Sequence, residues 1–164
     1  MRLRTRLLAT LAAAGVATAG LVGVQAEPSQ AAPRDGICDP GELCYYYNSN
    51  YGGAVSDFPS GYHLHPQHAG SIASYGNTQP SCYEYKDDPR QPGISPGTGR
   101  CVKNDAASVW NRTPFMVRIY YNSNYAGPYV ELAPGAKANL ADLRSTPAGT
   151  NLKNNNASHG YFRV

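Results

Sequence analysis

The sequence is poor in the patterns that mark helical proteins and enzymes. Beyond the first 26 residues it shows no helical spacing of apolar positions, so a helical bundle is excluded. It contains no Gly-x-Ser-x-Gly, no His-Glu-x-x-His and no paired carboxylates, the arrangements on which common hydrolases depend. Only 15% of the residues are charged. We therefore expect a protein that is not an enzyme and requires no cofactor.

The first residues differ from the rest in composition. Three arginines precede an uncharged, Ala- and Leu-rich run at residues 7–24, and small residues follow up to Ala26. This order predicts a secretory signal peptide, residues 1–26, with cleavage as late as Ala31 or Ala32. The alternative is a membrane anchor, which the high Gly and Ala content of the run disfavours.

Little net charge remains once the signal is removed. Residues 27–35 are expected to form a disordered leader, and residues 36–164 the folded domain. Three of the 14 Lys and Arg and one of the 11 acids lie ahead of residue 33, which lowers the net charge from +3 to +1. Such a domain is expected to bind neither nucleic acid nor a membrane surface. We expect a secreted, extracellular monomer.

Four cysteines remain in the domain, an even number that is typical of disulfides in an exported protein. Of the three possible connectivities, Cys38–Cys44 and Cys82–Cys101 are favoured, because each closes a local loop and crosses none of the repeats described below. A four-thiolate zinc site would need CxxC-like pairs, which the sequence does not have.

Short runs rich in Tyr, Val, Ile and Phe alternate with clusters of Asn, Gly, Pro and Ser, the pattern of an all-β protein. The 13 tyrosines are expected to pack their rings inward and leave their hydroxyls at the wet edge. Trp110 is expected in the core. Strands are predicted at residues 43–47, 54–58, 107–111, 116–121, 129–132 and 159–164.

Two phrases each occur twice, in the same order. YYNSNYGG at residues 46–53 returns as YYNSNYAG at 120–127, and VKNDAAS at 102–108 returns as LKNNNAS at 152–158. One supersecondary unit is therefore used twice, and such a unit usually packs against its copy.

The first unit is longer than the second. Tyr46 and Asn104 of its phrases are 58 residues apart, against 34 for Tyr120 and Asn154 of the second unit, an excess of 24. The excess falls in a stretch of turn-forming Pro and Gly. A surface loop at residues 77–101, with Cys82–Cys101 clipping its ends, is therefore predicted as an insertion in the first unit.

The first phrases fit aromatic-x4-aromatic-x-Gly, which resembles the Greek-key signature of βγ-crystallin domains. The glycine supplies a positive φ, and an aromatic ring lies over its bare Cα. The pattern is met at Tyr46, Tyr51 and Gly53, and again at Tyr120, Tyr125 and Gly127.

A narrower resemblance covers about residues 36 to 164. An N-terminal Cys-x5-Cys, the two hairpin phrases, VKNDAASVWN and LKNNNASHG, taken in order, resemble the secreted actinobacterial peptidase inhibitor family I36. The resemblance implies one all-β, βγ-crystallin-like sandwich of two Greek keys. The first key would span residues 36–112 with its disulfide-closed insertion, and the second residues 113–164.

The second phrases resemble the calcium-binding stretch of the βγ-crystallin superfamily, Asx-Asx-x-x-Ser/Thr-Ser. Two weak sites are implied, because a single candidate side chain is anionic and the motif's final Ser is Val109 in one copy and His159 in the other. The alternative is that these side chains cap loops through local hydrogen bonds. The candidate calcium ligands are Asn104, Asp105, Ser108, Asn154, Asn155 and Ser158.

The I36 resemblance implies an extracellular peptidase as partner, with a metallopeptidase favoured. A substrate-like inhibitor needs an exposed loop held rigid, so that little entropy is lost on docking. Disulfide closure and prolines give the insertion that rigidity. It includes Gly93 and Ile94, an apolar residue that would suit a thermolysin-like enzyme. Arg100 leaves trypsin-like targets open. The alternative function is a non-catalytic structural or weakly calcium-binding module of the extracellular space.

Three histidines, His63, His65 and His68, lie close together in a loop flanked by Pro and Gly. Three imidazoles could hold Zn²⁺ or Cu²⁺. No Cys or acid accompanies them, so solvated loop histidines are the favoured interpretation.

Overall fold

The structure is a computed structural model and describes residues 34–60 and 82–163. The predicted signal peptide, the leader up to residue 33 and the three clustered histidines lie outside the described residues. Within them the chain forms seven strands and one short 3-10 helix, η1 (Ser49–Tyr51). No helix in this part of the chain has the length and hydropathy needed to cross a bilayer.

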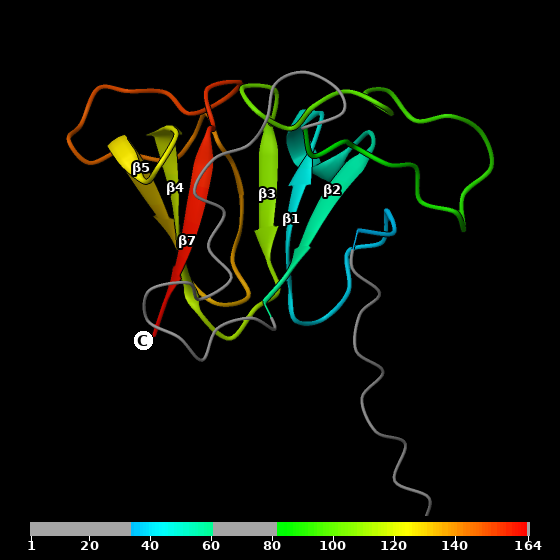
Figure 1. The fold of residues 1–164 in the computed structure, drawn as a ribbon, viewed down its shortest axis with the longest axis horizontal. Helices are drawn as coiled ribbons and strands as arrows, with labels where there is room; N and C mark the ends of the chain where they lie inside the picture. The colour runs from blue at the N-terminus through cyan, green and yellow to red at the C-terminus, as the bar shows by residue number, and fades with distance from the viewer. Residues whose placement is uncertain (1–33, 61–81, 164) are drawn as a thin grey trace, which may run out of the picture.

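The strands form two antiparallel sheets that lie side by side (Figure 1). The first sheet has the order β2-β1-β3-β6 and the second the order β5-β4-β7. The first is made of β1 (Glu42–Tyr46), β2 (Val55–Pro59), β3 (Ser108–Asn111) and β6 (Lys137–Asn139). The second is made of β4 (Met116–Asn122), β5 (Ala126–Leu132) and β7 (Ser158–Phe162). The all-β prediction is confirmed.

Alternation along each strand places one face of each sheet in a common core. Leu43 and Tyr45 of β1 point inward, whereas Cys44 between them faces the other side of the sheet, opposite Trp110. The core draws on both sheets: its members include Leu43, Tyr45, Phe58, Val109, Val117, Ile119, Val130, Leu132 and Tyr161.

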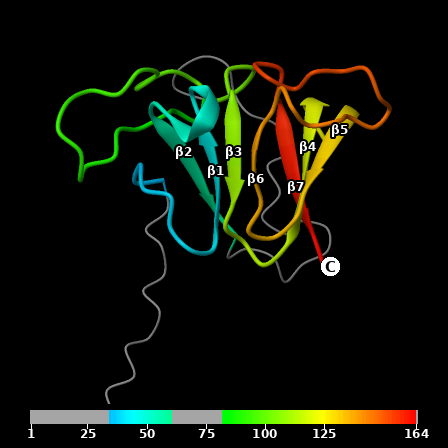
Figure 2. The ribbon, with the colours of Figure 1, turned by 180° about the vertical axis from the view of Figure 1, so that it is seen from behind.

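Strand β6 crosses from one unit to the other. It follows β5 in the chain, but it pairs with β3 of the first sheet, at Val109–Ala138 and its neighbours. The chain then returns to the second sheet as β7, beside β4. Figure 2 shows β6 between β3 of the first sheet and β7 of the second. This is the connection expected of a Greek key. The sequence pattern does not predict β6, because a strand of three residues is too short to show alternation.

The two units share unusual backbone angles at matched positions. Gly53 and Gly127 have φ of 74° and 77°, which confirms the predicted positive-φ turns. The Tyr46–Tyr51 and Tyr120–Tyr125 rings meet edge to face, with centroids 5.9 and 5.8 Å apart. The matched residues with left-handed φ are Asn50 and Asn124, Tyr51 and Tyr125, and Asn104 and Asn154.

Both predicted disulfides are present. The Cα atoms of Cys38 and Cys44 lie 5.8 Å apart, and those of Cys82 and Cys101 lie 5.4 Å apart. The Cys82–Cys101 bridge closes a ring of about 20 residues, which in the chain-entropy account adds roughly 3 kcal/mol of stability.

Two expectations need correction. Trp110 is not in the core. It lies half-buried on the outer face of the first sheet, where its ring centroid is 4.5 Å from the Arg112 guanidinium and 3.6 Å from the Lys137 ammonium. The insertion is not all surface loop, because Tyr85 is 1% exposed and joins the core.

Candidate functional site

The insertion rises from a two-stranded stem, residues 83–86 and 100–102. Tyr85 N–H donates to Arg100 O (2.8 Å), and Val102 N–H donates to Tyr83 O (2.8 Å). Val55 of β2 exchanges two backbone hydrogen bonds with Lys86, at 2.7 and 3.0 Å. The stem therefore continues the first sheet past its edge strand. The Cys82–Cys101 disulfide joins the two segments at the base of the stem, and the loop projects from the molecule beyond β2 (Figure 1).

The returning half of the loop, residues 96–99, is pinned to the body. Ala54 N–H donates to Pro96 O (2.9 Å), and Gly99 N–H donates to Tyr85 O (2.9 Å). Gly97 lies flat on the ring of Tyr47, so closely that a Cβ built there would overlap the ring carbon Cγ. With φ of +94° at Gly97, only glycine suits the position on both counts.

The outgoing half, residues 88–95, forms an exposed arm held by two carboxylates. The Asp88 carboxylate accepts hydrogen bonds from the backbone and the guanidinium of Arg90, and these lower the pKa of Asp88 to about 2. The Asp87 carboxylate accepts from Ser95 N–H and from Thr98 Oγ1 (2.7 Å), and both lower its pKa. Asp87 therefore ties the end of the arm to the pinned half.

Ile94 stands at the end of this arm. It is 85% exposed, more than any other large hydrophobic side chain of the described residues. Gly93 before it has φ of +97° and open space around its Cα. An apolar side chain in this position gains no burial within its own fold, so it is free to be buried against a partner.

Arg100 is separated from Gly93 and Ile94. It lies in the stem, where its guanidinium donates to both oxygens of Asp105 (2.7 and 3.0 Å) and stacks 5.2 Å from the centroid of the Tyr47 ring. Of the three predicted contact residues, the structure thus places Gly93 and Ile94 in the exposed arm and Arg100 in the stem. No sequence signal points to Asp87, whose partners lie eight and eleven positions away.

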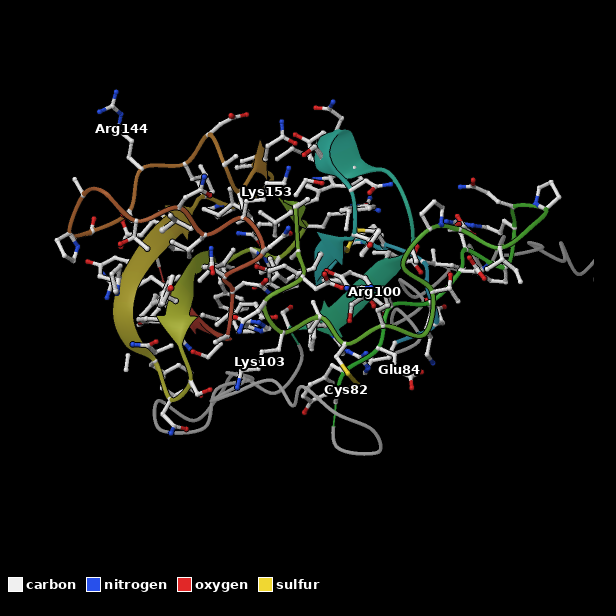
Figure 3. The ribbon with its side chains drawn as sticks, turned by 90° about the horizontal axis from the view of Figure 1, so that it is seen from above. Cys82, Glu84, Arg100, Lys103, Arg144 and Lys153 are labelled. Carbon is white, nitrogen blue, oxygen red and sulfur yellow. A yellow bond between two sulfur atoms is a disulfide. The ribbon has the colours of Figure 1, made fainter. Side chains whose placement is uncertain are left out.

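Four of the six calcium candidates line two matched pockets between the units. One is lined by Lys103, Asn104 and Asn155 with the second hairpin, residues 121–123. The other is lined by Lys153, Asn154 and Asp105 with the first hairpin, residues 47–49. Figure 3, in which the molecule is seen from above, shows Lys103 and Lys153 between the strands of the two units. Each pocket thus combines asparagine side chains from both units with one lysine.

Ser108 and Ser158 serve the hairpins and line neither pocket. The Ser108 hydroxyl donates to Asn48 O (2.6 Å) and accepts from Tyr51 N–H (3.0 Å). The Ser158 hydroxyl makes the same two bonds in the second unit, to Asn122 O (2.7 Å) and from Tyr125 N–H (3.2 Å). Both serines are fully buried, and their hydrogen bonds hold each folded hairpin to the last strand of its own unit.

The donor set of the pockets fits weak calcium binding at most. Amide oxygens are acceptable ligands, but carboxylates supply the affinity. The carboxylate of Asp105 is already engaged by Arg100, and the pocket of Asn104 and Asn155 has no acid among its lining residues. No group of three or more His, Cys, Asp or Glu side chains in residues 34–60 and 82–163 is arranged to hold a metal ion.

Comparison with known proteins gives one family and one solved structure. The model of peptidase inhibitor family I36 matches residues 31–132. A structure described as "Evolution of the eye lens beta-gamma-crystallin domain fold" aligns over 79% of this chain and 92% of its own, with a TM-score of 0.48 and 12% identity. No curated protein matches. The family match contains the whole insertion and both hairpin phrases.

Proposed function

Because the chain belongs to peptidase inhibitor family I36, we propose that it is a secreted inhibitor of extracellular peptidases that acts through the arm at residues 88–95. Members of an inhibitor family are not catalysts, and this chain is not an enzyme. Two disulfides among the described residues support an oxidising, extracellular setting, as does the predicted signal peptide.

The observation that carries the proposal is Ile94 at the end of a fastened arm. A loop that is already ordered loses little conformational entropy when a peptidase closes around it. The disulfide at the base, the Asp87 hydrogen bonds and the contact of Gly97 with Tyr47 all supply this order. Burial of Ile94 in an apolar pocket would then provide the anchor of the complex.

A metallopeptidase of the thermolysin type is the proposed target. Such enzymes take an apolar side chain on the primed side of the cleavage point, and Ile94 offers one. Arg100 supports a trypsin-like target poorly, because Asp105 and Tyr47 hold its guanidinium at the base of the loop.

The test is titration of the purified mature domain against thermolysin, subtilisin and trypsin. We expect thermolysin to be inhibited, and Ile94→Asp to weaken that inhibition by about 100-fold. Ala148→Asp is the matched control, since it adds the same charge to an exposed loop of the second unit. No inhibition at micromolar protein, or equal loss in both variants, would contradict the proposal.

A second candidate function, weak calcium binding by a structural module, is favoured by the two matched pockets. If the dissociation constant is near 10⁻⁴ M, ten millimolar Ca²⁺ should add roughly 2.7 kcal/mol of stability per site. Asp105→Ala should remove most of this effect. Arg100→Gln should enlarge it, because it frees the Asp105 carboxylate. A melting temperature that neither calcium nor EDTA changes would rule the function out.

A further inference from the structure

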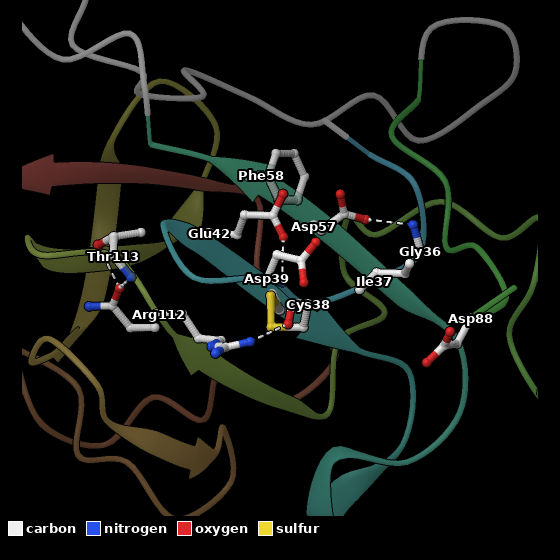
Figure 4. The surroundings of a disulfide bond; sticks show 12 residues. Gly36, Ile37, Cys38, Asp39, Glu42, Asp57, Phe58, Asp88, Arg112 and Thr113 are labelled. Carbon is white, nitrogen blue, oxygen red and sulfur yellow. Dashed lines mark hydrogen bonds between the residues drawn. A yellow bond between two sulfur atoms is a disulfide. The ribbon is translucent and has the colours of Figure 1, made fainter. Parts of the chain in front are cut away.

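Residues 34–37 form a strap along β2. Asp57 of β2 is 1% exposed, and its carboxylate accepts hydrogen bonds from the backbone N–H of Asp35 and of Gly36, both at 3.1 Å (Figure 4). Asp35 in turn accepts from Ile37 N–H (2.8 Å). A buried carboxylate that receives two backbone N–H groups fixes the path of the strap across the sheet.

Arg34 joins the strap to the stem of the insertion. Its guanidinium donates to Glu84 O of the stem (2.9 Å) and to Ser56 Oγ of β2 (3.2 Å). It also lies 4.7 Å from the ring centroids of Phe58 and of Tyr83. One side chain thus contacts the edge strand and the stem by hydrogen bonds and by two cation–π contacts.

Gly36 brings the strap against the residue that holds the arm. Its φ is +87°, and a Cβ built on it would overlap the carbonyl oxygen of Asp87 and lie 3.1 Å from Cβ of Lys86. The side chain of Asp87 fastens Ser95 and Thr98. The strap, Asp87 and the arm therefore form one continuous set of contacts from Arg34 to Ile94.

We propose that residues 34–36 are positioning residues of the arm. By packing on Asp87 from behind, the strap keeps the Asp87 carboxylate turned toward Ser95 and so keeps the arm closed. The inference rests on the proposed inhibitory function only where it concerns the affinity of the arm for a peptidase. It also makes the start of the mature chain part of the inhibitor, so that trimming of the secreted protein past Gly36 weakens it.

The experiment compares Gly36→Ala with Gly41→Ala in the mature chain. Both glycines have positive φ (+87° and +95°), but nothing lies within 4 Å of a Cβ built on Gly41. Both variants therefore carry the same backbone strain, and Gly36→Ala alone pushes the strap away from Asp87. Arg34→Ala, with Arg34→Lys beside it, tests the other end of the strap.

The readouts are hydrogen exchange of the Ser95 N–H, the rate at which the arm is cut by a non-target protease, and the inhibition constant for thermolysin. In Gly36→Ala we expect about ten-fold faster exchange and cutting, with a matching loss of inhibition, and no such change in Gly41→Ala. Arg34→Lys should resemble Arg34→Ala, because an ammonium cannot reproduce the planar contacts of a guanidinium.

The possible outcomes separate the inference from the proposed function. If Ser95 exchange is the same in Gly36→Ala and Gly41→Ala, the positioning role is wrong, whatever the inhibition data show. If the arm loosens while thermolysin inhibition is unchanged, the strap does not serve the inhibitor and the inference is also wrong. If the unmodified protein inhibits no peptidase, the proposed function fails, and faster Ser95 exchange in Gly36→Ala still supports the strap's hold on the arm.

Discussion

Single carboxylates organise the first unit of this protein. Asp57 holds the strap and Asp87 holds the arm, each by accepting backbone N–H groups. Glu42 differs from both. Its Oε2 accepts Asp39 N–H (2.8 Å), but its Oε1 has no hydrogen-bond partner among the described residues, and the residue is fully buried. Burial, and the charges of Asp57, Asp39 and Asp35, raise the pKa of Glu42 to about 7.

Stability should therefore depend on pH through Glu42. Between about pH 4.5 and pH 7 the unfolded chain loses the Glu42 proton while the folded chain keeps it, so folding becomes less favourable as the pH rises. Glu42→Gln removes this cost. We expect the variant to match the unmodified protein near pH 4 and to exceed its free energy of unfolding by about 2 to 3 kcal/mol at pH 8.

Urea unfolding at several pH values checks this prediction. Glu131→Gln is the control, since it alters an exposed carboxylate paired with Arg118 and should change stability by less than about 1 kcal/mol. A constant difference between Glu42→Gln and the unmodified protein from pH 4 to pH 8 would show that Glu42 does not titrate in this range.

Among the elements, the insertion depends most on local fit. Its pinned half lies on Tyr47 through Gly97, and the arm is tied to that half through Asp87. Gly97 and Gly99 both have positive φ but differ in what surrounds them. Gly97 has φ of +94° against the Tyr47 ring, whereas Gly99 has φ of +79° with nothing within 4 Å of a built Cβ.

Gly97→Ala should release the pinned half, and Gly99→Ala should not. Each substitution costs about 1 kcal/mol through its left-handed φ, but only Gly97→Ala displaces an aromatic ring. We expect faster hydrogen exchange at Ala54 N–H, which donates to Pro96 O, in Gly97→Ala alone. Equal exchange in the two variants would mean that the Tyr47 contact does not hold the loop.

The sequence was sufficient to predict the elements with repeated local signals. The hairpin phrases carried their own positive-φ glycines, and the spacing of the cysteines predicted both bridges. The strap could not be predicted, because Arg34 meets its partners 22 to 50 positions away and composition marked its neighbourhood as leader. For a similar reason the sequence did not predict that residues 83–86 extend the first sheet. Lys86 pairs with Val55, far away in the chain, and neither segment carries a local pattern for that pairing.

At the scale of the whole molecule, the two units are joined by hydrogen bonds that are only partly symmetric. Asn104 N–H donates to Asn156 O (2.7 Å), and Asn154 N–H donates to Ala106 O (2.8 Å), which is symmetric. The side chain of Asn156 adds two bonds that its counterpart Ala106 cannot return: it accepts from Ala106 N–H (3.1 Å) and donates to Val102 O (3.0 Å). Asn156 is fully buried.

Asn156→Ala should destabilise the whole protein. It leaves the buried N–H of Ala106 without a partner and removes one of the two hydrogen bonds that Val102 O accepts, at a cost of about 2 to 3 kcal/mol, or roughly 10 °C in melting temperature for a domain of this size. Asn151→Ala, which removes a hydrogen bond to Lys153 N–H at an exposed site, is the control. Calorimetry should show one transition in each case. Two separate transitions in Asn156→Ala would mean that the units unfold independently.

The crossing of β6 also makes the second unit dependent on the first. By sequence β6 belongs to the second unit, but its hydrogen bonds are with β3 of the first. The second unit alone would lack that partner, and could replace it only with the matching strand of another copy. Fragments cut between β3 and β4 should therefore recognise each other and reassemble without a covalent link.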